Sequence, residues 1–76
     1  MKKNWYTRKD KTFVLKIGNW KALEISKRHH KGYCCFVFNK GKVVAGEGYH
    51  GTSLPKRYHA VRWGCKKLRE LNLWNK

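Results

Sequence analysis

The stretch that decides the fold is YCCFVFNKG, residues 33–41. Its first six residues are aromatic, β-branched or cysteine, a composition that favours a buried β-strand. Side chains alternate along a strand, so the even-numbered residues of this segment would lie on one face of a sheet and the odd-numbered residues on the other. The NKG tripeptide that follows is typical of a tight hairpin, which predicts a returning strand over residues 42–49.

Two segments before residue 33 continue the extended pattern. Residues 13–17 (FVLKI) end at Gly18 and Asn19, a turn signal, and residues 20–25 (WKALEI) place Leu23 and Ile25 on one face. Residues 26–32 break this pattern, and we interpret them as a loop between strands. The sequence therefore predicts a sheet of three to four antiparallel strands.

After residue 52 the period of the apolar residues becomes that of a helix. Ser53 is a suitable N-cap, and Pro55 fits the first helical turn. We expect a helix from residue 54 to about residue 71, with Trp63 on its basic side. The expected apolar stripe, spaced by steps of four and three, is Leu54, Tyr58, Val61, Cys65 and Leu68.

Strands followed by a single helix predict one α+β domain over residues 12–76, with the C-terminal helix packed on one face of the sheet. Residues 1–11 form a basic arm that carries Trp5 and Tyr6. This arm is either disordered or folded onto the domain through its two rings. The other face of the sheet would remain open to a partner.

The balance of charge points to the nature of that partner. The chain has 19 Lys and Arg but only four acids in 76 residues, a formal net charge of +15. Such a surplus destabilises the compact state, and a polyanion is the simplest reason for it. We therefore expect a small nucleic-acid-binding protein whose partner is double-stranded DNA, with RNA as a variant. The residues expected to contact it are Lys16, Trp20, Lys21, Lys27, Arg28, Lys31, Lys40, Lys42, Lys56, Arg62, Trp63 and Lys66.

A second hypothesis is of a different class. A phage-type accessory protein could use the same charge to bind an acidic host protein and to inhibit or redirect it. Trp63 and Trp74 would then be its anchors. The alternative for each ring stays open: the arm could cover Trp63, and Trp74 could dock on the core of the domain.

Enzyme activity, cofactors and metal binding are not expected. The four acids are dispersed along the chain, and Cys34 and Cys35 would point to opposite faces of a strand. Cys65 belongs to the apolar stripe, so the usual spacing of zinc ligands is missing. No apolar run is long enough to span a bilayer, and none follows the first lysines as in a signal peptide. These features favour a cytoplasmic location, the host cytoplasm if a phage encodes the chain.

Residues 20–68 resemble the three-stranded, single-helix domains of AP2-type DNA-binding proteins and of the N-termini of tyrosine recombinases. The resemblance is carried by WKALEI (20–25), GYCCF (32–36), GKVVAG (41–46) and the helical residues Ala60 and Leu68. In these families the open sheet face enters the major groove, where strand residues contact bases and phosphates. The residues at matching positions are Trp20, Lys21, Lys40 and Lys42. The portion from residue 33 to the helix also resembles YegP-like domains.

Overall fold

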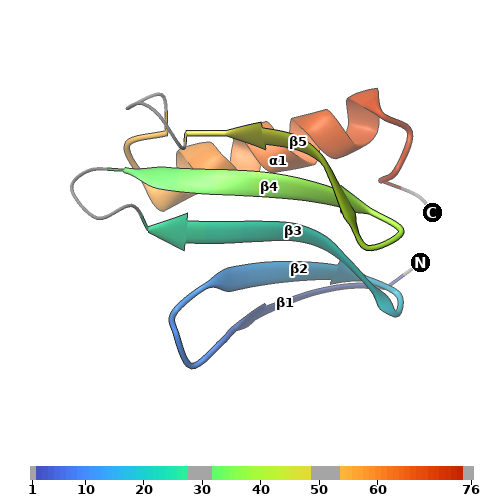
Figure 1. Cartoon of the computed structure of the whole chain (residues 1–76), viewed down its shortest axis with the longest axis horizontal. Coiled ribbons are helices and arrows are strands. Elements are labelled where there is room, and N and C mark those ends of the chain that lie inside the picture. The colour runs from blue at the N-terminus through green and yellow to red at the C-terminus, as the bar shows by residue number, and fades with distance from the viewer. Residues whose placement is uncertain (1, 28–31, 49–53, 75–76) are drawn as a thin grey trace.

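The computed structural model describes residues 2–27, 32–48 and 54–74. Five strands precede one helix: β1 (Lys3–Thr7), β2 (Phe13–Ile17), β3 (Trp20–Lys27), β4 (Tyr33–Asn39), β5 (Lys42–Glu47) and α1 (Arg57–Glu70). The strands form one antiparallel sheet in sequence order, and α1 lies across the far face of that sheet in Figure 1. The α+β class is confirmed, but the sheet has five strands instead of the expected three to four.

The additional strand is β1, which lies inside the predicted basic arm. It pairs with β2 along its whole length, so that Trp5 stands opposite Leu15. The intervening turn is closed by the Thr12 backbone N–H, which donates to Asp10 Oδ1 at 3.0 Å. The arm is therefore ordered as an edge strand, because β2 offers it a complete ladder of backbone partners.

The β4–β5 hairpin forms where the sequence predicts it. Both central residues have positive φ, 55° at Lys40 and 81° at Gly41, as a type I′ turn requires. Further along, Val37 pairs with Ala45 but Phe38 pairs with Val43, so one residue of β5 is extra at this point. This bulge bends the edge strand and helps to protect it from pairing with another chain.

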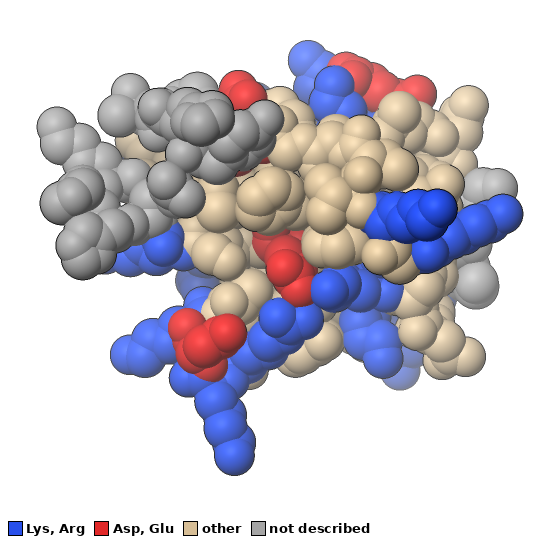
Figure 2. Space-filling model, in the orientation of Figure 1, with Lys and Arg blue, Asp and Glu red and all other residues tan. Residues whose placement is uncertain are grey.

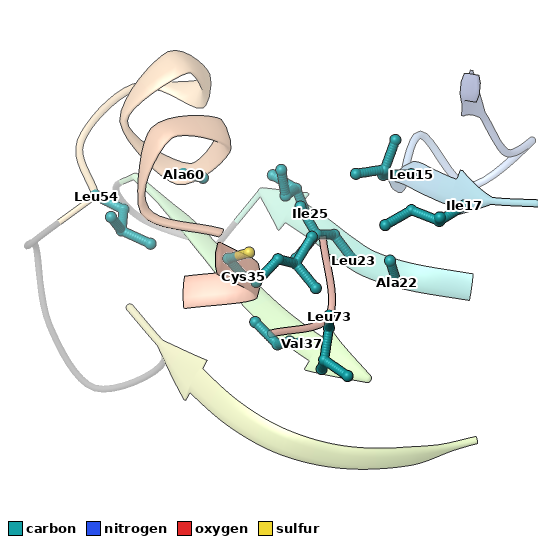
Figure 3. Packing of buried hydrophobic residues seen from close by; sticks show 11 residues of the cluster. Leu15, Ile17, Ala22, Leu23, Ile25, Cys35, Val37, Leu54, Ala60 and Leu73 are labelled. Carbon is teal, nitrogen blue, oxygen red and sulfur yellow. The ribbon is translucent and has the colours of Figure 1, made fainter. Parts of the chain in front are cut away.

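The core lies between the sheet and α1 (Figure 3). The residues of α1 that face it most closely are Ala60, Gly64 and Leu68, all buried. A Cβ atom on Gly64 would lie 2.8 Å from Cys35 Sγ and 2.9 Å from Leu23 Cδ1. The glycine therefore allows α1 to approach β3 and β4 closely.

The predicted helix was correct in type but wrong at its start and at one position of its apolar stripe. It begins at Arg57, after Lys56 as N-cap, so Pro55 precedes the helix, and Ser53 lies outside the described residues. Tyr58 is 55% exposed instead of buried. Ala60 and Gly64 face the sheet together with Leu68, and their small size permits this short distance between the layers.

The chain after α1 is fixed to the domain. The Leu73 N–H donates to Leu68 O at 2.8 Å and the Asn72 N–H to Arg69 O at 3.1 Å, with φ of 60° at Asn72. These two bonds form a Schellman motif, which places Leu73 against the core next to Leu68. Trp74 also packs against the core cluster. Within the described part of the chain, no helix is long and apolar enough to cross a membrane.

Candidate nucleic-acid interface

The face of the sheet that α1 does not cover is built from the residues that alternate with the core residues. Pairing across β1 to β4 brings Tyr6, Val14, Glu24 and Phe36 into one row. In the next row Lys16 stands opposite Lys21. We call this surface the open face. It combines aromatic, aliphatic and cationic side chains over neighbouring strands.

Glu24 organises the cations of the open face. Arg8 Nη2 and Lys21 Nζ each donate to Glu24 Oε2 at 2.7 Å. Partial burial acts to raise the pKa of Glu24, but the hydrogen bond and charge of Lys21 and the charge of Arg8 outweigh it and lower that pKa. The carboxylate is therefore ionised at neutral pH and holds one cation from the β1–β2 turn and one from β3 side by side.

Apolar side chains dominate the other half of the open face. Lys21 Nζ lies 4.1 Å from the centroid of the Phe38 ring, a cation–π contact at the boundary of the two halves. On β5, Val43 is 55% exposed and Val44 is 47% exposed. Figure 2 shows this division: Lys and Arg gather over β1 and β2, whereas other residues cover most of β4 and β5.

The predicted contact residues of the sheet fall into three groups. Lys16 and Lys21 lie on the open face, and Lys40 and Lys42 flank the tip of the β4–β5 hairpin. Lys27 is exposed at the end of β3. Arg28 and Lys31 lie outside the described residues. The structure thus brings together only part of the predicted set on one surface.

Trp20 was wrongly assigned to that surface. It pairs with Ile17, a fully buried core residue, and its ring packs against the core cluster. A register shift between β2 and β3 next to Lys16 separates Trp20 from the regular alternation of the strand. Its ring therefore contributes to the packing of the core.

The remaining predicted residues belong to the helix end of the molecule. Lys56 is the exposed N-cap of α1, and Arg62 and Lys66 are exposed on α1 itself. Trp63, for which both exposure and cover by the arm were left open, packs against the core cluster, with Lys67 Nζ 5.7 Å from its ring centroid. Because α1 turns Ala60 and Gly64 toward the sheet, the Trp63 ring lies on a side of the helix that contacts the core.

Sequence reasoning missed several cations that aromatic rings hold in place. The Arg57 guanidinium lies 4.8 Å from the centroid of Phe13, and Trp5 stacks on the same ring at 4.5 Å and 11°. Lys3 and Arg69 both lie over Trp74, at 4.6 Å and 4.5 Å. These partners are far apart in the sequence, so only the register of β1 and the end of α1 reveal them.

The thiols are poorly suited to act as nucleophiles or metal ligands. Burial, with smaller effects of Cys65 and Cys34, raises the pKa of Cys35 to about 12. Burial also raises the pKa of Cys65, although the charge of Arg69 opposes it. Over the described ranges of the chain, no three His, Cys, Asp or Glu residues gather into a possible metal site.

Comparisons with protein-family models, curated proteins and solved structures found no match to this chain. The likeness to AP2-type, recombinase and YegP-like domains therefore stays a prediction from the sequence.

Proposed function

We propose that this protein binds double-stranded DNA through the open face of its sheet. The observation that carries the proposal is the composition of this face, where a cationic half adjoins an apolar half on one uncovered sheet. The major groove of DNA admits β-structure, and phosphates flank it on both sides. A surface with apolar residues beside cations matches that arrangement of bases and phosphates.

The residues would divide their roles by position. Lys16 and Lys21 on the open face would hold phosphates, and Lys42, which pairs with Asn39 at the hairpin tip, would hold one beside that face. These contacts supply affinity without sequence choice. The exposed Val43 and Val44 would face the base edges, where apolar side chains contact the methyl group of thymine. Charge would provide most of the binding free energy, in keeping with a net charge of +15.

A salt titration with matched variants tests this proposal. The Lys16→Gln/Lys42→Gln variant removes two charges from the sheet side, and the Arg62→Gln/Lys66→Gln variant removes two from the helix. Fluorescence anisotropy with a short labelled duplex would measure the affinity of each variant at several salt concentrations. We expect the first variant to lower the slope of log affinity against log salt by about two, one for each lost phosphate contact.

The helix variant is expected to keep nearly the wild-type slope when protein and duplex bind one to one. Equal losses in the two variants would mean that net charge alone matters and that the open face has no special role. Absence of duplex binding in dilute buffer would contradict the proposal altogether. Competition with RNA hairpins and single strands would show whether the phosphate geometry of a DNA duplex is preferred.

The alternative function, binding to an acidic host protein, relied on Trp63 and Trp74 as free anchors. Both rings pack against the core cluster of the domain. No other observation on the described residues favours that alternative, so nucleic-acid binding remains the proposal.

A further inference from the structure

A second cationic surface lies on α1, on the side of the molecule opposite the open face. Between residues 56 and 70 the chain carries six Lys and Arg but one acid, Glu70. The outward positions of the helix include Arg62, Lys66 and Arg69, which are all exposed. They recur at steps of four and three, so they share one side of α1 and span about 10 Å along its axis.

These three cations surround a shallow depression of about 420 Å³. Val61 and Cys65 complete its lining, so apolar atoms lie between the charged groups. Glu70 is engaged by Lys67, whose Nζ lies 3.1 Å from Glu70 Oε1. The described residues that line the depression therefore include three cations and no acid.

Aromatic rings restrain the cations next to this depression. Arg69 lies over Trp74, which the Schellman motif at the end of α1 fixes in place, and Lys3 approaches the same ring. At the other end of the helix, Arg57 lies over Phe13. Side chains that are already restrained lose less conformational entropy when they bind a phosphate. Arg69, one of the three cations of the depression, is thus restrained before a charged ligand binds.

The two cationic surfaces are too far apart to serve one duplex. The molecule measures 34 × 27 × 20 Å, and its shortest axis runs through the stacked sheet and helix in Figure 1. At physiological ionic strength charges are largely screened beyond about 8 Å. A duplex seated on the open face would therefore leave the cations of α1 unneutralised.

We propose that the depression on α1 binds the phosphate backbone of a second nucleic-acid segment, so that one molecule bridges two duplexes. This proposal rests on the proposed function, since the open face must hold the first duplex. The occupant of the depression is fixed by charge complementarity, because Arg62, Lys66 and Arg69 line it with hydrogen-bond donors for phosphate, next to Val61 and Cys65.

The test uses a duplex attached to beads and a second, fluorescent duplex in solution. Protein is added below one equivalent of total duplex, and the fluorescence retained on the beads measures bridging. The Arg62→Gln/Lys66→Gln/Arg69→Gln variant removes the charge of the depression, and glutamine preserves the helix. The Lys16→Gln/Lys40→Gln/Lys42→Gln variant loses the same charge from the sheet side. Circular dichroism confirms that both variants are folded, and sedimentation of the protein alone confirms that it is monomeric.

We expect wild-type protein to retain the fluorescent duplex on the beads. In the helix triple variant the retained fluorescence should be at least tenfold lower, while the affinity for a single duplex changes less than twofold. The sheet triple variant should lose both activities. Binding of a single duplex without bridging by the wild type, or bridging that persists in the helix variant, would overturn this inference and leave the proposed function standing. Absence of binding to any single duplex would overturn the proposed function itself.

Discussion

The two faces of the sheet use the same strands for different purposes. On the face under α1, Leu23 and Val37 are fully buried in a core of aliphatic residues. On the open face Val14 and Phe38 are also buried, but no helix covers them. Charged residues lie there instead, with Lys21 over Phe38 and bonded to Glu24. The comparison indicates that one face holds the buried core, whereas the other presents charged side chains.

The largest expected effect is a difference between the two faces in how much a truncated side chain lowers the free energy of unfolding. Leu23→Ala would leave a cavity beneath α1, and we expect it to lower the free energy of unfolding by about 2–5 kcal/mol. The matched change on the open face, Val43→Ala, should cost less than about 0.5 kcal/mol because Val43 is largely exposed. Urea unfolding measures both. Similar losses in the two variants would show that the faces do not differ in this way.

A smaller effect concerns the dependence of stability on pH. The pKa of Glu24 in the folded protein lies below its ordinary value of 4.5. Its contribution to stability is therefore complete above pH 4.5 and is lost as the pH falls through the lowered pKa of the folded state. Wild-type protein should lose more stability than Glu24→Gln between pH 7 and pH 3, as measured by urea unfolding.

Glu70→Gln is the control for this experiment, since it removes an acid from an exposed ion pair on α1. It should keep the acid dependence that Glu24 provides. If Glu24→Gln loses as much stability in acid as the wild type does, Arg8 and Lys21 do not stabilise the carboxylate as their contacts indicate.

The same two variants, Glu24→Gln and Glu70→Gln, also compare the open face with α1 in DNA binding. Glu24 cancels part of the charge of the open face, so Glu24→Gln should bind a duplex several-fold more tightly at low salt and with a steeper salt dependence. Glu70→Gln adds the same net charge on α1 and should change the affinity for a single duplex much less. Anisotropy titrations measure both, and equal gains would indicate a response to net charge only.

The smallest expected effect lies in the β1–β2 turn. Lys11 has a φ of 71°, a conformation that costs a residue with a side chain roughly 1–2 kcal/mol. Glycine avoids this strain, but its greater conformational freedom in the unfolded chain offsets part of the gain in stability. Lys11→Gly should therefore raise stability by less than about 1 kcal/mol. Lys9→Gly removes the same charge from the same turn without relieving a positive φ, and it should not stabilise. A loss of stability in Lys11→Gly would contradict this description of the turn.

The parts of the fold that were predictable from the sequence depend on local signals. Lys40 and Gly41 mark their own turn, and the alternation within β4 is visible because its residues are large and apolar. The strand β1 was missed because its ladder depends on β2 and its residues are mostly polar or exposed. In the apolar stripe of α1 only Tyr58 was misjudged, and the contribution of Ala60 and Gly64 was not visible because they are small and carry little apolar signal of their own.

Of the candidate site, only its positive charge was predictable from the sequence. The sequence indicates that Lys16 and Lys21 are exposed cations, but only the register between β2 and β3 brings them opposite one another. The ion pair of Arg8 with Glu24 joins residues sixteen positions apart through the β1–β2 turn, which no local pattern encodes. For Trp63 the sequence left exposure and burial both open, because its position relative to the sheet depends on how α1 is rotated.

The most direct test of the central claim is a map of backbone amide NMR shifts, with the protein in excess over a short DNA duplex. If the open face binds the first duplex, the largest shifts should fall on Lys16, Lys21 and residues 42–44, with smaller changes along the outward side of α1. Shifts confined to α1, or no shifts at any residue in dilute buffer, would contradict the assignment of the open face as the DNA-binding surface.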